Sequence, residues 1–483
     1  MQVTRRQFVA LGLGAGVGMA MRSRGAGGGE PEPLGTGLEL IGSVKPVPSA
    51  QIQASPLSVG FETLDRKHFD PTRTYAHLAK LGVKWARCQT GWNRCEPARG
   101  TFDFAWLDAV VDSLLKIGIQ PWFNLGYGNR VYTPKADAAA VGWAPVFDDA
   151  AKEAWVRFTR AIAGHFRTRV RHWEIWNEPN ISTFWKPRKP NPADYVALVK
   201  LTAPEIRQRV PGAVIIGAAL AGTPTGYLKG CLDAGLAEHV HRISYHPYRA
   251  VPEAGYAAQV AAMRKLLAAT GKPIKLWQGE NGCPSKGGKG SVGALSNLEW
   301  DETRQAKWLL RRILSDLRLG LELTSYFHTI DLVGYRGKTN FKGLLRGTTY
   351  EPKPSYRAYQ CLCALFDART TLDPKLTLDL VGQKKVHLQD VGFVRDGRAL
   401  YAWWLPASLQ KGFEPRRISV RLATRPDATL TNPVLIDPLT SRVYRLPDGK
   451  RHGGALTFES LPLLDSPLLV ADGGVAGWGG PAR

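Results

Sequence analysis

The feature that most constrains the fold is a regular alternation of short β-like runs and longer helical runs between residues 58 and 328. Each β-like run is rich in aromatic, aliphatic or β-branched residues, and a segment of helical periodicity follows all but the last. The expected strands lie at 58–62, 83–87, 120–124, 172–178, 213–219, 242–246, 275–280 and 323–328. The expected helices lie at 75–81, 106–117, 150–166, 192–209, 226–234, 256–269 and 301–319. Eight strands with connections long enough for right-handed crossovers predict an α/β fold, the (β/α)8 TIM barrel.

The pattern changes after about residue 368. Short strand-like pieces at 400–404, 417–421, 433–436 and 467–470 are joined by turns rich in Gly, Asp and Pro. This is typical of a small C-terminal β-sandwich. We therefore expect a linker or entry segment at 31–54, a barrel at 55–367, a sandwich at 368–475 and a flexible tail at 476–483. A doubly wound open sheet is the alternative to the barrel, but the chain has no glycine-rich phosphate fingerprint.

The first 30 residues have the pattern of an export signal. Thr4-Arg5-Arg6-Gln7-Phe8 precedes a weakly apolar stretch that ends near Met21. This arrangement resembles a twin-arginine signal, and the apolar stretch is shorter than the ~20 residues that a membrane span needs. We expect export to the periplasm or the medium, and no membrane span in the mature chain. An uncleaved signal that serves as an anchor is the alternative.

The formal charge is +23, and it is still +19 when the four arginines of residues 1–29 are set aside. An excess of this size favours an anionic partner or surface, although a basic surface without a specific partner explains it equally well. The basic residues are scattered, with no arginine-rich tract or finger spacing, which argues against nucleic acid. An acidic polysaccharide or a cell envelope fits the charge as well.

The six cysteines show no spacing typical of a metal site. A disulfide between Cys88 and Cys95 would be compatible with export, but buried free thiols are the simpler interpretation.

Residues 171–180, Arg-His-Trp-Glu-Ile-Trp-Asn-Glu-Pro-Asn, carry the strongest local signal in the chain. Their tryptophans and isoleucine favour a buried strand, and Pro179 with Asn180 ends it. Glu178 therefore lies at the carboxyl end of the fourth strand. A carboxylate is costly to bury there, and this edge of a barrel is where barrel enzymes place their chemistry. A solvated turn glutamate is the plain alternative.

Few other polar residues fall at strand ends. Glu280 closes the seventh strand, so it is expected to face Glu178 across the barrel mouth. Two carboxylates on one cavity are what the cleavage of a glycosidic bond requires. The remaining candidates at this rim are Glu62, Arg87, Asn124, Asn177, His246, Tyr248 and His328.

Trp176-Asn177-Glu178-Pro179, combined with the second glutamate on strand seven, resembles the clan of retaining glycoside hydrolases with a (β/α)8 barrel. Within that clan the chain is most similar to the family of β-xylosidases and α-L-iduronidases, over residues 55 to 370. The resemblance implies that Glu178 is the general acid/base and Glu280 the nucleophile. It also implies a carbohydrate substrate and no cofactor.

The resemblance suggests further roles at the rim. The Asn177 amide would bind the sugar 2-hydroxyl, Arg87 would keep Glu280 ionised, and Tyr248 or Tyr245 would donate to Glu280. His246 would line the pocket. Burial and the charge of Glu280 should raise the pKa of Glu178.

The other assignments rest on the residues alone. Glu62 and Asn124 would either bind sugar hydroxyls or cap loops, and Glu174 should point into the barrel and need a partner there. Arg87 would otherwise close a structural ion pair, and His246 would be a hydrogen-bonded core histidine. The tryptophans that could stack on a sugar, or else belong to the core, are Trp92, Trp185, Trp277 and Trp300.

The chain departs from the clan pattern in two places: residues 326–331 lack a tryptophan, and Gly279 stands where a bulkier residue is common. These departures bear on the substrate more than on the reaction. A metal-dependent barrel hydrolase is disfavoured because the first strand does not end in H-x-H. A non-catalytic carbohydrate-binding barrel is the remaining alternative. It would have little reason to keep both glutamates, so a retaining glycosidase is the hypothesis that the sequence favours.

Overall fold

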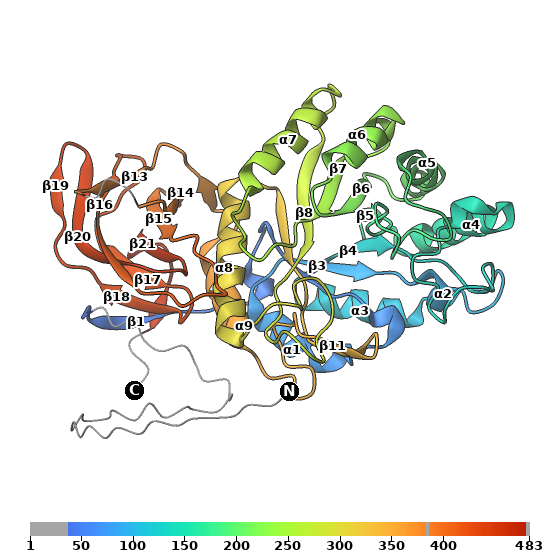
Figure 1. Cartoon of the computed structure of the whole chain (residues 1–483), viewed down its shortest axis with the longest axis horizontal. Helices are drawn as coiled ribbons and strands as arrows, with labels where there is room; N and C mark the ends of the chain where they lie inside the picture. The colour runs from blue at the N-terminus through green and yellow to red at the C-terminus, as the bar shows by residue number, and fades with distance from the viewer. Residues whose placement is uncertain (1–36, 383–385, 480–483) are drawn as a thin grey trace, which may run out of the picture.

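A computed structural model of the chain describes residues 37–382 and 386–479. The expected export signal at residues 1–30 lies outside the described residues. The part that is described consists of a barrel and a β-sandwich that lie side by side, with helices α8 (Glu302–Arg318) and α9 (Pro354–Leu365) between the barrel strands and the sandwich (Figure 1). The predicted fold class is confirmed.

Eight parallel strands close the barrel in sequence order. Closure is made by the first and last strands, where Leu57 pairs with Thr324. The strands are β2 (Leu57–Gly60), β3 (Trp85–Gln89), β4 (Gln120–Leu125), β5 (His172–Ile175), β6 (Val214–Ala221), β7 (Arg242–His246), β8 (Lys275–Asn281) and β9 (Leu323–Tyr326). Nearly all of their residues are buried, as expected for parallel strands that have helices on one side and the barrel interior on the other.

Helices surround the barrel, and several begin at sequence-encoded caps. The Asp148 side chain accepts from Ala151 N at the start of α4, and Asp301 does the same for Arg304 N at the start of α8. The helices, besides α8 and α9, are α1 (Tyr75–Leu81), α2 (Trp92–Cys95), α3 (Ala105–Lys116), α4 (Asp149–His165), α5 (Pro192–Arg209), α6 (Thr225–Asp233) and α7 (Tyr256–Ala268). The sequence periodicity did not predict α9.

The barrel interior changes character along its axis. At the amino-terminal end of the strands Trp122, Ile216, Trp277 and Leu323 form a separate apolar cluster. Towards the carboxyl ends the interior becomes polar, with Arg87 and Glu174 fully buried there. Two-residue alternation places Trp122 and Asn124 on the same inward face of β4. The barrel therefore has a packed apolar floor beneath a charged rim.

The sandwich consists of two antiparallel sheets. The larger has the strand order β12-β14-β15-β21-β17-β18-β1-β22 and the smaller β13-β16-β20-β19. The strands of the larger sheet are β12 (Thr370–Leu372), β14 (Gln389–Arg395), β15 (Arg398–Trp404), β21 (Leu468–Asp472), β17 (Pro433–Asp437), β18 (Arg442–Arg445), β1 (Leu40–Val44) and β22 (Trp478–Gly479). Those of the smaller are β13 (Leu378–Val381), β16 (Arg416–Ala423), β20 (Ala455–Leu463) and β19 (Lys450–His452).

Two predicted boundaries of the sandwich are wrong. Residues 40–44, expected in a linker, form β1 and pair with β18, and residues 478–479 of the expected flexible tail pair with β1. They end one side of the larger sheet, where β22 is the edge strand and β1 is the strand next to it. They are short and come from segments rich in Gly, so their β character follows from their neighbours more than from local propensity. The described part of the chain thus contributes a strand to the sandwich before it forms the first barrel strand.

The sandwich is fixed to the barrel by buried polar contacts as well as by apolar packing. Arg311 of α8 forms an ion pair with Glu253 and donates to the carbonyl of Ala407. Trp404 Nε1 donates to the same glutamate. Apolar residues of both units belong to one continuous core cluster. The sandwich therefore supports the outer side of the barrel.

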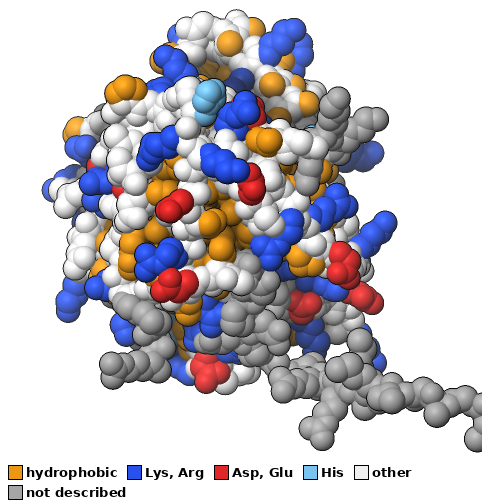
Figure 2. All heavy atoms as spheres, turned by 90° about the vertical axis from the view of Figure 1, so that its left-hand side faces the viewer, with side chains coloured by type: hydrophobic (Ala, Val, Ile, Leu, Met, Phe, Trp, Pro, Cys, Tyr) orange, Lys and Arg blue, Asp and Glu red, His pale blue; other side chains and the backbone are white. Residues whose placement is uncertain are grey.

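The remaining sequence-level expectations concern the cysteines, the membrane and the surface. All six cysteines are buried free thiols, so the structure does not contain the considered Cys88–Cys95 disulfide. Among the described residues, no helix has the length and apolar composition needed to cross a membrane. Basic side chains are scattered over the sandwich end with acids between them (Figure 2), unlike the continuous basic face of a nucleic-acid-binding protein.

Candidate active site

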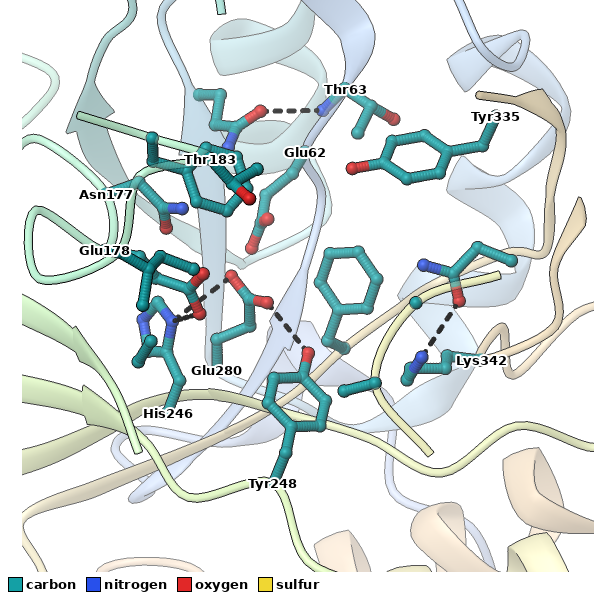
Figure 3. Close-up of a pocket in the computed structure, with 18 of the residues that line it drawn as sticks. Glu62, Thr63, Asn177, Glu178, Thr183, His246, Tyr248, Glu280, Tyr335 and Lys342 are labelled. Carbon is teal, nitrogen blue, oxygen red and sulfur yellow. Dashed lines mark hydrogen bonds and ion pairs between the residues drawn. The ribbon is translucent and has the colours of Figure 1, made fainter. Parts of the chain in front are cut away.

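The carboxyl ends of the barrel strands surround a cavity of about 340 Å3. This volume is at the lower end of the range of ~300–1,000 Å3 that is usual for small-ligand sites. Its walls combine three carboxylates, three cations, several amides and hydroxyls, and aromatic rings (Figure 3). The ionisable lining residues, apart from its tyrosines, are Glu62, Glu178, Glu280, His246, Arg66, Arg336 and Lys342.

The chain leaves β5 through a strained turn that presents Glu178 to this cavity. Trp176 and Glu178 have φ angles of 70° and 48°, in the left-handed region that residues with a Cβ rarely adopt. The turn is held by a hydrogen bond from Glu178 N to the carbonyl of Ala219, and Asn124 Nδ2 donates to the carbonyl of Trp176. Strain of this kind costs about 1–3 kcal/mol per residue and is concentrated at functional sites.

Glu178 lies in a setting that favours its protonated form. It is 8% exposed, and its Oε1 is 2.9 Å from Nδ1 of His246. Burial raises the pKa of Glu178 to about 7, and the negative charge of Glu174 adds to the effect, while Arg87 opposes it. The sequence-based reasoning correctly expected a raised pKa but named Glu280 as the neighbouring charge.

His246 contributes no positive charge to this pair. Burial lowers its pKa to about 4, so the imidazole is neutral near pH 7. A neutral ring can exchange a hydrogen bond with Glu178 without forcing the carboxyl group to ionise. Its Nε2 is buried and has no hydrogen-bond partner among the described residues.

Glu280 lies in the opposite setting. Its Oε2 accepts from Arg87 Nη1 at 2.7 Å, and its Oε1 accepts from the Tyr248 hydroxyl at 2.8 Å. A guanidinium and a hydroxyl donor both stabilise the carboxylate form. Burial and the charge of Glu280 raise the pKa of Tyr248 well above its ordinary value, so this phenol remains a donor.

The close packing beneath Glu280 explains why a glycine precedes it. A Cβ at Gly279 would lie 2.0 Å from Oγ of Ser244 on the neighbouring strand and 3.3 Å from Oε1 of Glu174. A bulkier residue at this position would displace β7 or the buried glutamate. The departure from the clan pattern at residue 279 is therefore a local packing feature.

Arg87 is the centre of the charge network below the cavity. Its fully buried guanidinium contacts Glu174 at 2.5 Å, Glu280 at 2.7 Å and Glu62 at 3.1 Å. It also donates to Oδ1 of Asn177, which leaves the Nδ2 group of that amide as the donor available to a ligand. One guanidinium faces three carboxylates, so a proton on one of them relieves the imbalance. Burial raises the pKa of Glu62 to about 8, although Arg87 lowers it, which makes Glu62 the carboxyl group that holds this proton.

The two catalytic candidates lie close together. One oxygen from each of Glu178 and Glu280 and one ring nitrogen of His246 lie within 4.8 Å of one another. In retaining glycosidases the two carboxyl groups are ~5–5.5 Å apart, against ~6.5–9.5 Å in inverting ones. The separation fits direct attack on the sugar by one carboxylate.

Glu178, His246 and Glu280 are residue types that bind metals, but their surroundings do not favour a cation. Three ligand atoms within 4.8 Å could approach one ion. However, Arg87 lies 2.7 Å from Glu280 Oε2, and its positive charge would repel a cation at this carboxylate. The hydrogen bond between His246 and Glu178 would also have to break. The arrangement is better matched to acid–base chemistry.

Most of the predicted site residues are brought together, but His328 is buried beside the cavity, where it accepts from Glu62 N, and three further sets also do not line it. Asn124 is fully buried below the cavity, where it donates to Glu174 and to the Trp176 carbonyl, so it positions Glu174 instead of binding sugar. Trp277 belongs to the apolar floor and donates to Glu322; three residues before Glu280, it lies about 10 Å below the rim. The tryptophans Trp92, Trp185 and Trp300 are also buried and do not line the cavity.

Sequence reasoning missed an entire wall of the cavity. The hairpin of β10 (Leu332–Tyr335) and β11 (Lys338–Asn340) follows the last barrel strand and contributes Tyr335, Arg336, Asn340 and Lys342. These residues lie beyond a strand end in a segment without a recognised motif. The alternation of polar side chains at 338, 340 and 342 was the available signal. Phe327 lines the cavity in the segment where a tryptophan was expected from the clan.

Comparison with known proteins confirms the predicted resemblance. Residues 64–271 match the model of the glycosyl hydrolases family 39. A β-xylosidase from Geobacillus stearothermophilus is 29% identical over 159 residues, which cover 30% of this chain and 31% of that protein. The match thus spans about a third of the length of this curated relative. The family match includes Glu178 but ends before Glu280, whose place opposite Glu178 is given by the structure.

Solved structures share the fold over most of the chain. A family 39 glycoside hydrolase from Bacteroides cellulosilyticus WH2 has a TM-score of 0.64 and 22% identity, with coverage of 86% of this chain and 80% of that one. A monomeric β-xylosidase from Caulobacter crescentus CB15 has a TM-score of 0.57 and 18% identity, with coverage of 89% and 97%. These similarities show that barrel and sandwich occur together in other proteins.

Proposed function

We propose that this chain, which resembles family 39 glycosyl hydrolases over residues 64–271, is a retaining glycosidase with Glu178 as acid/base and Glu280 as nucleophile. One observation carries the proposal. Two glutamates face one cavity within 4.8 Å, and their surroundings favour opposite protonation states. A two-step displacement needs one carboxyl group that can donate a proton and a second that is held as a carboxylate by hydrogen-bond donors.

In the first step an oxygen of Glu280 attacks the anomeric carbon and the bond to the leaving oxygen breaks. The proton of Glu178 passes to that oxygen, so the departing group leaves as a neutral alcohol. Tyr248 and Arg87 hold Glu280 ionised and oriented until it bonds. The product of this step is a sugar ester of Glu280 and an ionised Glu178.

In the second step Glu178 removes a proton from water, and the water oxygen attacks the same carbon. The ester bond breaks and Glu280 returns to its carboxylate form. Esterification has removed one negative charge beside Arg87, so the guanidinium acts more strongly on the remaining carboxylates. This stabilises the ionised Glu178 at the stage where it acts as a base.

We propose a poly- or oligosaccharide of the cell envelope or the surroundings as the substrate. The twin-arginine pattern of the first residues supports export, and the β-xylosidase relative acts, by its name, on a glycoside. Fractionation of cells that express the full chain tests the location, and retention of the protein in the cytoplasm would contradict it. The formal charge alone does not choose between neutral and acidic sugars.

The reaction is tested with a panel of aryl glycosides of both anomeric configurations and with proton NMR of the first product. Retention of configuration is expected, together with loss of hydrolysis in Glu280→Gln. Inverted product would contradict the two-step mechanism. If the wild type binds sugars but hydrolyses none of the panel, the chain is a carbohydrate-binding barrel instead.

A further inference from the structure

The wall of the cavity formed by the β10–β11 hairpin holds a cation that the proposed reaction does not use. Lys342 follows β11 and is 1% exposed, yet its ammonium group forms no ion pair within the described residues. Among the residues that the structure describes, this ammonium donates to Oδ1 of Asn340 at 3.3 Å. Buried lysines are ordinarily paired with an acid, because an unpaired buried charge is costly.

The amine of Lys342 lies at the wall of the cavity, with only neutral side chains as contacts among the described residues. It lines the cavity, 5.7 Å from the Tyr248 ring. Figure 3 shows it on the other side of Tyr248 from His246 and Glu178. Burial lowers its pKa to about 8, and the charge of Glu280 opposes this shift, so most of the amine is still charged at pH 7.

The neighbouring loop is adapted to this amine. Gly293 lines the same wall with φ +97°, and a Cβ there would lie 2.8 Å from Nζ of Lys342 and 3.1 Å from Nδ2 of Asn340. A side chain at residue 293 would therefore occupy the space beside both donors. The glycine leaves an ammonium and an amide accessible side by side.

The three cations that line the cavity differ in whether they have an acidic partner. Arg66, the second lining cation, is paired with Asp65 and donates to Gln89. Arg336, the third, is exposed at the rim, 5.4 Å from the Tyr335 ring, and forms no ion pair within the described residues. On the hairpin wall two cations thus lack an acid, whereas Glu280 and Glu178 on the opposite side are engaged by Arg87 and His246.

We propose that the hairpin wall, through Lys342 and Asn340, binds an anionic substituent of the sugar whose glycosidic bond is cleaved, and that Lys342 determines this specificity. The inference rests on the proposed glycosidase function. The ammonium forms the ion pair, the Asn340 amide donates alongside it, and Arg336 attracts the anion at the entrance. A carboxylate on the ring and an ester sulfate share this chemistry.

The test compares matched substrates that differ only in this group: aryl glucuronides and 6-O-sulfated glucosides against the neutral glucosides, and the galacto and xylo counterparts. The wild type should hydrolyse one anionic member with the highest kcat/KM in the panel, and the preferred member distinguishes carboxylate from sulfate. Lys342→Met should lower kcat/KM on that substrate about 10- to 100-fold, the range for a lost charge-assisted hydrogen bond. On the neutral counterpart it should change by less than about threefold.

Lys286→Met is the matched control, because Lys286 lies over the Phe341 ring on the other face of the same hairpin segment and lines a different cavity. It should leave both substrates unaffected. A wild type that prefers the neutral glycoside, or a Lys342→Met variant that loses the same factor on both, would overturn the assignment while the glycosidase stands.

Calorimetric binding of free glucuronate and glucose separates this inference from the reaction itself. Glucuronate should bind the wild type more tightly than glucose, and Lys342→Met should remove the difference. If no glycoside of the panel is hydrolysed, the proposed function fails, whereas a Lys342-dependent preference for the anion still supports the anion site. Equal binding of the two sugars to the wild type would overturn it.

Discussion

Glu178 and Glu280 are the same residue type at the same rim of one barrel, yet their hydrogen-bond partners differ. Glu178 faces a neutral imidazole in a buried turn, and burial raises its pKa to about 7. Glu280 is held by a guanidinium and a phenol hydroxyl. The difference teaches that the role of a catalytic carboxyl group is set by its partners on other strands and strand ends. Here these are His246 at the end of β7, Tyr248 two residues beyond it, and Arg87 of β3.

Removing the nucleophile should give the largest effect. Glu280→Gln keeps the shape of the side chain but cannot form the ester, so kcat/KM should fall on the order of 10⁴-fold or more for every substrate. Steady-state rates on an aryl glycoside measure the loss. A fall of less than about tenfold would remove Glu280 from the reaction.

The loss of activity on removing the acid/base Glu178 should depend on the leaving group of the substrate. Glu178→Ala should lower kcat/KM about 10²- to 10⁴-fold for alkyl glycosides, whose leaving oxygen needs a proton. For dinitrophenyl glycosides the first step should be nearly unaffected, since that leaving group departs without a proton. An equal loss on both substrates would contradict the assignment of Glu178 as acid.

The difference in setting between Glu178 and Glu280 depends on Arg87, whose ion pairs also link carboxylates of several barrel strands. Arg87→Met leaves three carboxyl groups around an uncompensated site and should lower the free energy of unfolding by about 3–5 kcal/mol. Urea denaturation measures it. Arg160→Met, which breaks the exposed pair with Glu205, is the control and should cost less than about 1 kcal/mol. Equal losses in the two variants would show that Arg87 has no special structural role.

A pH-dependent effect on stability concerns Glu62, the third carboxyl group of the cavity. Its pKa in the folded protein is raised from 4.5 to about 8 by burial, so the folded state binds more protons than the unfolded state between these values. Its contribution to stability is therefore present below pH 4.5 and is lost as the pH rises towards 8. Urea denaturation at pH 5 and pH 8 should show a smaller decrease for Glu62→Gln than for the wild type. An unchanged decrease would mean that Glu62 is ionised in the folded protein.

The sequence predicts much of the barrel and of the candidate site. The candidates that it identified lie near the carboxyl ends of strands with clear β periodicity, and a barrel brings all strand ends to one rim. They are Glu178, Glu280, Arg87, Asn177 and Tyr248. Asn124 and Trp277 were misplaced because two-residue alternation gives the face of a strand but not the depth along the barrel axis. The hairpin with Lys342 was missed because it lies beyond the last barrel strand, and the short polar alternation at 338, 340 and 342 does not indicate where the hairpin lies relative to the barrel mouth. Strands β1 and β22 of the larger sheet were missed because their pairing is decided by distant residues.

The stereochemistry of azide products tests the division of roles most directly. With an aryl glycoside and added azide, Glu178→Ala should form a glycosyl azide that keeps the configuration of the substrate, because azide attacks the ester of Glu280 in place of water. Glu280→Gly under the same conditions should form the azide of opposite configuration, because azide then replaces the nucleophile itself. Proton NMR distinguishes the two anomers. The same anomer from both variants, or the reverse assignment, would contradict the roles given to Glu178 and Glu280.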